Sequence, residues 1–540
     1  MFYRDQDQLY LLTTLFLRCA INEVKHIMDY IRCVLLLTCV LAGNSTVMGL
    51  YIDGCPMYGC RPSGSFSFYL QVPTSNTSVN WVSDLKMDPL PNPLGCVSDT
   101  SSIVCQSNGV FETDKGYVSL QHNGSIAWRD KLLQLPPLPI IDNFGDVTGS
   151  DGDKLVHYDQ NGKTYPAIPC HNLKPIYNMA LVGDSDLLLV SGNGNIVVRQ
   201  TNGVPVGSLT LNDTVGQTNG TFVPIAQPAI NSNENRFYLL TKFVPQKSRD
   251  KNTTTQDDII LRVYAIDVHA SISDRITLVW NLTLTSYLSS SLDEPTRDGN
   301  VFSENMQGLL FDRVNKLLYV NVRVQSNINN KGGERLNGAI YGINDSGKMV
   351  FVNSETNVQV MTKFVTDHCS TTGSKSDVSD TVSDSLLWLL TRDQVIQGVD
   401  KGGKTVKTYN LNQMFNASVA VTSHVSSVRN SDVDNDTLVF AIVLKKFTSA
   451  KFEVNVASSK QSSALKYKSK HVTQTSYVIA IDTGKDDTDK AAISWMVHVP
   501  NNMIVRGQIS GAGGADVGMK DQLVAYAETP GKSAVYFTIQ

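Results

Sequence analysis

The chain has 540 residues, which is enough for several domains or for one large repeat architecture. It carries 46 Lys and Arg residues against 50 Asp and Glu residues, and the formal net charge of -4 excludes the basic footprint of a nucleic-acid-binding protein. Only 18% of the residues are charged, and Asn, Ser, Thr, Val and Gly are abundant. This composition favours strands joined by polar turns over helical bundles.

An apolar run over residues 31–42 predicts a secretory signal peptide. Val40-x-Ala42 fits the small-residue rule for cleavage, and the run is too short to cross a bilayer comfortably. Met28 stands just before the run, so we predict that translation starts there and that residues 28–42 are the signal peptide.

Residues 1–27 are then an upstream extension. The alternative is a start at Met1, in which Leu9–Leu17 forms part of a signal-anchor. No later stretch is apolar enough to cross a membrane, so we expect a secreted, extracellular protein with no transmembrane span in its mature chain.

The cysteines agree with secretion. Three of the nine lie in or before the predicted signal peptide, and the even number that remains predicts disulfides in an exported chain. Proximity in the sequence pairs Cys55 with Cys60 and Cys96 with Cys105, which leaves Cys170 with Cys369. The alternative for the last pair is a zinc site that also uses His171 and His368, although an oxidising compartment favours the disulfide.

Sequons for N-glycosylation occur along the whole chain, many of them in predicted turns where a glycan fits. They begin at Asn44, Asn76, Asn123, Asn212, Asn219, Asn252, Asn281, Asn344, Asn416 and Asn435.

Residues 43–65 form a Cys- and Gly-rich loop, and we expect a single domain over residues 66–540. The domain opens with two predicted strands joined by a turn, Phe66–Val72 and Val79–Leu85. Trp81 lies in the second of them.

The clearest repeat unit is Gly116–Asp130. Alternating apolar residues lead into Asn123-Gly124, a tight-turn pair, and a second short run ends on Trp128. The unit therefore reads as a β-hairpin with an aromatic anchor. Similar groups of strands recur over Lys154–Ile168, Asp186–Leu211, Arg236–Leu284, Lys316–Asn353, Ser385–Asn410 and Thr437–Val499.

The last strands, within Gln522–Ile539, have no closing strand with a Trp. We predict that the N-terminal strands complete this final sheet and close a ring, which removes the exposed edges of a linear array. The fold class is all-β, a β-propeller of eight blades, with seven as the alternative. Polar insertions are expected to be surface loops. They cover Val244–Asp258, Gln325–Leu336, Ser370–Asp384 and Lys446–Gln474.

Several units share a pattern of the form A-x-D/N-x-x-x-G-x-x-x-W. Ala265-Ile-Asp267 with Trp280, and Ala480-Ile-Asp482-Thr-Gly484 with Trp495, follow it best. The pattern resembles the pyrroloquinoline-quinone-type repeat of the quinoprotein alcohol dehydrogenase-like propellers. In that family the Trp docks between adjacent blades, and the resemblance implies this role for Trp81, Trp128, Trp280 and Trp495.

The resemblance is structural and does not extend to a cofactor. The alcohol dehydrogenases of that group place a vicinal Cys-Cys disulfide against the quinone, and this chain has no adjacent Cys pair and no C-x-x-C-H haem motif. It also lacks H-E-x-x-H and G-x-S-x-G, the local signatures of a zinc protease and a serine hydrolase.

Calcium is a better candidate ligand than a quinone. Asp432, Asp434 and Asp436 stand at alternate positions, and Asp146, Asp151 and Asp153 resemble the calcium loops of integrin-like propellers, one residue out of register. The alternative is an acidic turn capped by its own Asp side chains.

The sequence therefore predicts a secreted glycoprotein that binds a protein or a glycan at its loop-rich face or central funnel, without enzymatic activity. The alternative is a metal- or quinone-dependent enzyme with its site in the central channel, because strand-end loops converge there. The basic stretch Lys466–His471 is expected to be a solvated surface, with an anionic glycan or lipid partner as the alternative.

Overall fold

The computed structural model divides the chain into two compact units, 1–49 with 369–373, and 50–368 with 374–540. It describes parts of the second unit alone, from Gly54 to Gln540. The gaps are 71–76, 84, 86, 91–92, 100–101, 109–114, 134–136, 143–144, 171–172, 174–175, 183–185, 201–202, 216–217, 232–234, 246–259, 270–275, 285–307, 327–334, 354–357, 366–384, 430–435, 455–464, 486–491, 515–518 and 530. The predicted upstream extension and signal peptide lie outside the described residues. No helix within the described part has the length and apolar character needed to cross a membrane.

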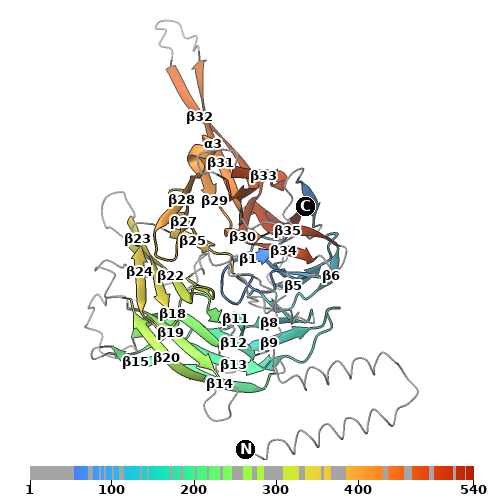
Figure 1. The fold of residues 1–540 in the computed structure, drawn as a ribbon. Helices are drawn as coiled ribbons and strands as arrows, with labels where there is room; N and C mark the ends of the chain where they lie inside the picture. The colour runs from blue at the N-terminus through green and yellow to red at the C-terminus, as the bar shows by residue number, and fades with distance from the viewer. Residues whose placement is uncertain are drawn as a thin grey trace, which may run out of the picture. The chain divides into compact units, whose positions relative to one another are not determined.

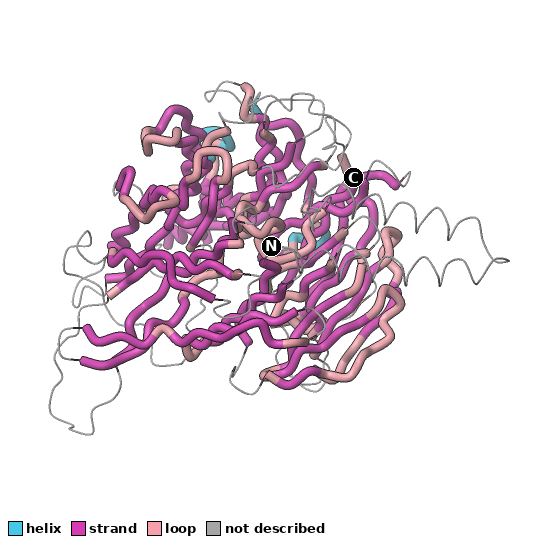
Figure 2. The backbone as a smooth tube through the Cα atoms, turned by 60° about the horizontal axis from the view of Figure 1, so that its bottom comes forward, coloured by secondary structure: helices cyan, strands magenta, loops and turns pink. Residues whose placement is uncertain are grey.

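The described unit is an eight-bladed β-propeller, as the sequence predicts (Figures 1 and 2). Blades 1 to 3 are four-stranded sheets. Blade 1 contains β3 (Cys96–Ser98), β4 (Ile103–Ser107), β5 (Gly116–Leu120) and β6 (Ile126–Arg129). Blade 2 contains β7 (Ile140–Ile141), β8 (Val147–Asp151), β9 (Lys154–Tyr158) and β10 (Ile168–Pro169). Blade 3 contains β11 (Ile176–Val182), β12 (Asp186–Ser191), β13 (Asn195–Gln200) and β14 (Pro205–Thr210).

Blade 4 is larger, because a hairpin is added to its sheet. It contains β15 (Asn212–Val215), β16 (Thr218–Pro224), β17 (Ala229–Asn231), β18 (Arg236–Pro245), β19 (Leu261–Val268) and β20 (Ile276–Thr283). Blade 5 contains β21 (Leu309–Asp312), β22 (Leu317–Ser326), β23 (Arg335–Asn344) and β24 (Met349–Asn353). Blade 6 contains β25 (Val358–Thr362), β26 (Leu387–Thr391), β27 (Val395–Val399) and β28 (Thr405–Asn410).

The short helix α3 (Leu411–Phe415) follows blade 6, with Asn410 as its N-cap. Blade 7 contains β29 (Ser418–Val421), β30 (Ser426–Arg429), β31 (Thr437–Val454), β32 (Leu465–Asp482) and β33 (Ile493–His498). After the 3-10 turn η4 (Pro500–Asn502), blade 8 contains β34 (Ile504–Gly514), β35 (Met519–Thr529) and β36 (Ser533–Ile539).

The N-terminal strand β2 (Val79–Val82) closes the ring. It pairs antiparallel with β36, the last strand of the chain, and so completes blade 8 as predicted. The sequence predicted that β2 forms a hairpin with the strand before it. That prediction is wrong, because the preceding strand, β1 (Ser67–Tyr69), pairs in parallel with β30 of blade 7. The alternation of residues predicts a strand but carries no information about which distant strand will be its partner.

The predicted loop Lys446–Gln474 is also wrong for most of its length. β31 and β32 continue through it in register, from Thr437 opposite Asp482 to Val454 opposite Leu465. Parts of two other insertions, Val244–Asp258 and Gln325–Leu336, likewise extend strands β18, β22 and β23, and Ser370–Asp384 lies outside the described residues.

The hydrophobic core lies between the faces of neighbouring blades. One cluster joins Tyr238 and Val263 of blade 4 to Phe311 and Tyr341 of blade 5, and others join blade 7 to blade 8 and blade 8 to blade 1 in the same way. Because both faces of each sheet are covered, the middle strands read as continuous apolar runs, as in Leu187–Val190.

Candidate functional site

The segment Gly54–Leu70, which we call the channel segment, occupies the space that the inner strands surround. Its described side chains are buried, and its backbone hydrogen-bonds to the inner strands of one blade after another. The partners lie at Ser98, Ile141, Ile230, Phe311, Lys363 and Ser427, from blades 1, 2, 4, 5, 6 and 7. Residues 54–65, expected as a loop before the domain, are therefore part of its interior, and the central channel is filled by the chain itself.

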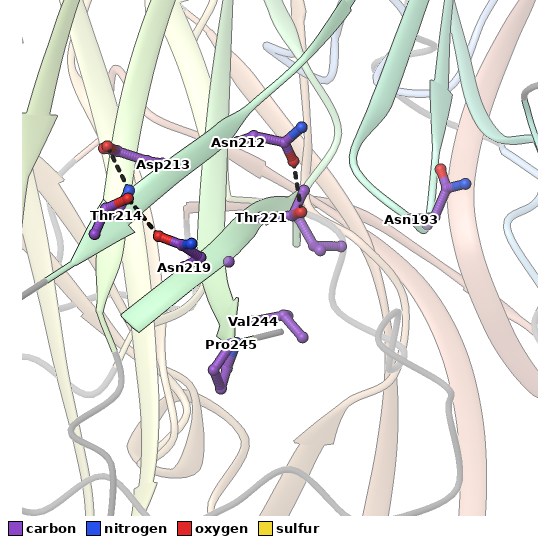
Figure 3. Close-up of a pocket in the computed structure, with 11 residues that line it drawn as sticks. Asn193, Asn212, Asp213, Thr214, Asn219, Thr221, Val244 and Pro245 are labelled. Carbon is purple, nitrogen blue, oxygen red and sulfur yellow. Dashed lines mark hydrogen bonds between the residues drawn. The ribbon is translucent and has the colours of Figure 1, made fainter. Parts of the chain in front are cut away.

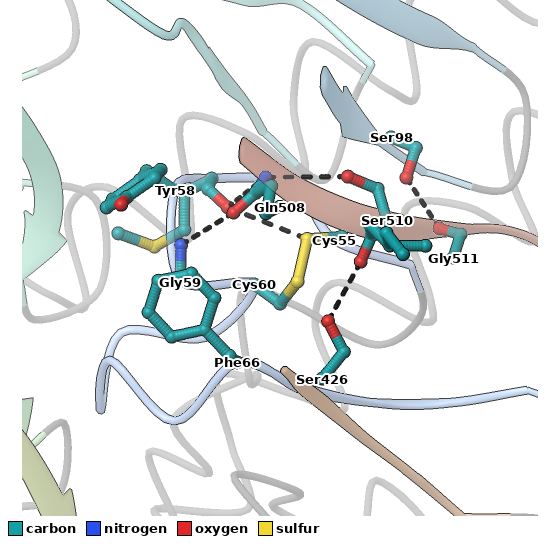
Figure 4. Close-up of a disulfide and its surroundings, with 12 residues drawn as sticks. Cys55, Tyr58, Gly59, Cys60, Phe66, Ser98, Ser426, Gln508, Ser510 and Gly511 are labelled. Atoms are coloured by element: carbon teal, nitrogen blue, oxygen red, sulfur yellow. Dashed lines mark hydrogen bonds between the residues drawn. A yellow bond between two sulfur atoms is a disulfide. The ribbon is translucent and has the colours of Figure 1, made fainter. Parts of the chain in front are cut away.

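A disulfide and a buried glutamine fix the channel segment in place (Figure 4). Cys55 is bonded to Cys60. Gln508 of β34 is fully buried; its Oε1 accepts a hydrogen bond from the Gly59 N–H at 2.9 Å, and its Nε2 donates to the Cys96 carbonyl at 2.6 Å. The second predicted disulfide, Cys96–Cys105, joins β3 to β4.

The aromatic part of the channel segment packs against His424. The Tyr58 hydroxyl lies 2.9 Å from His424 Nε2, and the Phe66 ring centroid is 4.9 Å from the imidazole. Burial raises the pKa of Tyr58 far above its usual value, so the phenol stays protonated. These contacts make a packed polar interior rather than an open site.

Two buried ion pairs lie beside the channel segment. Lys363 Nζ is 3.2 Å from Asp312 Oδ2, with both side chains almost fully buried. Arg429 donates to Asp436 Oδ1 at 2.7 Å. Asp436, one of the three expected calcium ligands, is thus held by an arginine, while Asp432 and Asp434 lie outside the described residues.

The second expected calcium loop takes a different form. Asp146 precedes β8 and Asp151 ends it, so a whole strand of about 15 Å separates them, and Asp153 lies in the turn that follows. The described residues contain no group of three His, Cys, Asp or Glu side chains that could share a metal ion. These three carboxylates do not come together because the loop is a β-hairpin.

Cys170 is buried and has no disulfide partner among the described residues, and burial is the main reason that the pKa of its thiol is raised. Its predicted partner Cys369 lies outside the described residues, as do His171 and His368 of the alternative zinc set. The pairing of Cys170 with Cys369 stays a prediction.

Three of the four anchor tryptophans lie against the turn of the next blade. Trp81 Nε1 donates to the His122 carbonyl at 2.7 Å, Trp280 Nε1 donates to the Asp345 carbonyl at 2.8 Å, and the Trp128 ring covers Gly162. Trp495 is different, because it packs in the apolar core between blades 7 and 8.

The sequons divide into two sets. Asn44, Asn76, Asn252 and Asn435 lie outside the described residues. In the described part, Asn123, Asn212, Asn219, Asn281 and Asn416 are exposed, and Asn344 is half-buried in a turn.

A surface depression of the described unit, which we call the hollow, has a volume of about 820 Å³ and lies between blades 3 and 4 (Figure 3). The β12–β13 turn forms one side of it, and the β15–β16 hairpin and the end of β18 form the other. Its lining combines amides, hydroxyls and one carboxylate with apolar surface. The lining residues are Gly192, Asn193, Asn212, Asp213, Thr214, Asn219, Gly220, Thr221, Val223, Val244 and Pro245.

Arg262 supports the hollow from β19. It forms an ion pair with Asp213, and its guanidinium lies 4.2 Å from the centroid of the Phe222 ring. The hydrogen bond from Arg262 holds the pKa of Asp213 below its usual value, and the Thr214 N–H adds to the effect. This hairpin was not predicted from the sequence, because residues 212–221 carry two sequons but too few apolar residues to show strand alternation.

No protein-family model matches this chain, and no curated protein matches it in sequence. Solved structures of similar fold include BamB from Moraxella catarrhalis, at 10% identity and a TM-score of 0.35, covering 68% of this chain and 93% of that one. The dihydro-heme d1 dehydrogenase NirN matches at 12% identity and a TM-score of 0.42, and the match covers 85% of this chain and 75% of that one. The C-terminal WD40 domain of Sif2 matches at 10% identity and a TM-score of 0.41, and the match covers 86% of this chain and 99% of that one. Such likenesses concern fold alone. The chain is an eight-bladed β-propeller whose repeats resemble those of the pyrroloquinoline-quinone type.

Proposed function

We propose that this protein is a secreted glycoprotein that binds an extracellular protein partner and catalyses no reaction, with a glycan as the alternative partner. The observation that supports binding most strongly is the long hairpin of blade 7. Its outer part, Lys446–Val454 with Leu465–Thr473, is here called the arm. Figure 1 shows β31 and β32 extending beyond the rest of their blade.

The arm is a sheet of two strands with open edges. Within the blade, β31 is flanked by β29 and β30 on one side and by β32 on the other. In the arm, the two strands pair only with each other among the described strands. Unpaired N–H and C=O groups along a strand edge are a template for adding a strand from another chain.

The composition of the arm indicates the charge of its partner. Five lysines and His471 occur in it against the single acid Glu453. The lysines are Lys446, Lys451, Lys466, Lys468 and Lys470. We therefore expect the partner to present an acidic surface.

The filled channel supports a binding function over the enzymatic alternative. A metal- or quinone-dependent site in the channel would require displacement of Gly54–Leu70, which hydrogen-bonds to inner strands around the ring. A ligand that leaves this segment in place has to bind on the outer surfaces.

The experiment removes the arm without breaking the blade. Lys445 and Gln474 are directly opposite each other, so a two-residue Asn-Gly turn can join them in place of residues 446–473. The secreted protein is cross-linked to extracellular proteins, the cross-linked lysines are mapped by mass spectrometry, and the affinity of the identified partner is then measured for both forms.

We expect cross-links at the arm lysines and loss of the partner in the shortened form, with unchanged thermal unfolding. Full affinity in the shortened form would contradict the arm as the binding surface. Elemental analysis and an absorption spectrum test the alternative, because stoichiometric zinc, a redox metal or a quinone band would make the protein an enzyme candidate.

A further inference from the structure

Two sequons in the hollow lie directly opposite each other on the two strands of one hairpin. The first sequon is Asn212-Asp-Thr214 on β15, and the second is Asn219-Gly-Thr221 on β16. Asn212 is directly opposite Thr221, and Thr214 is directly opposite Asn219. Because residues two apart share a face of a strand, both Asn and both Thr residues lie on the same face.

Each threonine donates to the asparagine of the other sequon (Figure 3). Thr214 Oγ1 lies 2.7 Å from Asn219 Oδ1, and Thr221 Oγ1 lies 2.7 Å from Asn212 Oδ1. These bonds use only the amide oxygens, so neither bond occupies an Nδ2 atom. Both asparagines are exposed. An N-linked glycan is attached through Nδ2, and the amide keeps its oxygen, so both hydrogen bonds persist in the modified protein.

The hollow has room and suitable walls for the first sugars of two glycans. Val244, 46% exposed, and Pro245 give it an apolar part, and Asn193 gives it a polar one. Sugar rings present both apolar faces and hydroxyl groups, which match this mixed lining.

We propose that Asn212 and Asn219 both carry N-linked glycans, side by side on the β15–β16 hairpin, with their first sugars over the hollow. In this modification the Nδ2–C1 bond forms, the bond from C1 to the diphosphate of a lipid-linked oligosaccharide breaks, and Nδ2 loses one proton. β15 pairs only with β16 among the described strands, so the paired glycans also shield an open sheet edge. The inference rests on the proposed secretion of the protein.

The test is glycopeptide mass spectrometry of the protein secreted from eukaryotic cells, with Asn212→Gln, Asn219→Gln and the double variant. We expect each single variant to lose one glycan and the double variant to lose two. Thr214→Val removes the glycan at Asn212 but keeps the one at Asn219, and Thr214→Ser keeps both, because a serine also completes a sequon. The matched control, Asn281→Gln, alters a single exposed sequon and leaves both glycans in place.

Position over the hollow is tested by hydroxyl-radical footprinting. We expect Val244 and Pro245 to be labelled more strongly in the double variant than in the glycosylated protein, and equal labelling would overturn the placement. Glycans at Asn123 or Asn281 with an unmodified Asn212 or Asn219 would overturn this inference alone. A secreted protein with no glycan at any sequon would overturn both it and the glycoprotein part of the proposed function.

Discussion

Trp128 of blade 1 stacks on Tyr158 of blade 2, with ring centroids 5.0 Å apart and ring planes 16° apart. The same indole covers Gly162, whose φ is +79° and whose Cβ, if present, would lie 2.4 Å from Trp128 Cγ. The turn glycine of one blade is therefore the docking surface for the aromatic residue of the preceding blade. This contact explains why the repeat couples a glycine to a tryptophan.

Substitution of Gly162 tests this docking. We expect Gly162→Ala to destabilise the protein more than Gly152→Ala, which is the matched control because Gly152 also has a positive φ, +63°, but no atom within 4 Å of an added Cβ. The control should cost about 1 kcal/mol, from backbone strain alone. Trp128→Ala should cost about 2–4 kcal/mol. Urea unfolding midpoints measure all three, and equal effects of the two glycine variants would refute the docking contact.

The Lys363–Asp312 pair should be sensitive to loss of its cation. Lys363→Met leaves a buried carboxylate without its partner, and we expect a loss of about 3–5 kcal/mol. Lys404→Met, at an exposed turn position, is the control and should change stability by less than about 0.5 kcal/mol. Thermal unfolding measures both. Similar melting temperatures for the two variants would mean that the buried pair is not an energetic requirement.

Gln508→Leu should loosen the channel segment. The change leaves the buried Gly59 N–H without its acceptor, which should cost about 1–3 kcal/mol. Hydrogen exchange should then speed up first at Gly59 and its neighbours in the channel segment. Gln413→Leu, on the exposed side of α3, serves as the control. Unchanged exchange in the channel segment would show that the bond from Gly59 to Gln508 is not needed to hold it.

Stability should fall in mild acid through His157. Burial lowers the pKa of this imidazole, although the nearby Asp146 raises it in part, and Thr148 Oγ1 lies 3.0 Å from its Nδ1. Below about pH 6.5 the imidazole of His157 therefore takes up a proton in the unfolded state before it does so in the folded state. The contribution of His157 to the unfolding free energy is fully present above that pH and is lost as the pH falls toward the pKa of the folded state.

His157→Gln removes this group from the titration. We expect the difference in unfolding free energy between wild type and variant to be constant above about pH 7 and to shrink below about pH 6.5. Urea titrations at several pH values give that difference. A difference that stays the same through this range would contradict the assigned cause.

Much of the fold is determined locally. Val118 and Leu120, the Asn123-Gly124 pair and Trp128 specify a hairpin with a docking aromatic, and repetition of that unit predicts a closed ring of blades. The same local rules predict the disulfides Cys55–Cys60 and Cys96–Cys105, because their partners are close in the chain.

Tertiary structure alone decided where nonlocal segments go. Residues 54–65 have the composition of a surface loop, yet they lie in the channel, because inner strands far apart in the sequence offer hydrogen-bond partners to their backbone. The separation of Asp146 from Asp151 and the crossed bonds of Asn212 and Asn219 likewise depend on strand pairing. A sequence pattern reports which face a residue shares with its near neighbours, whereas the identity of the strand opposite it is fixed only when the sheet assembles.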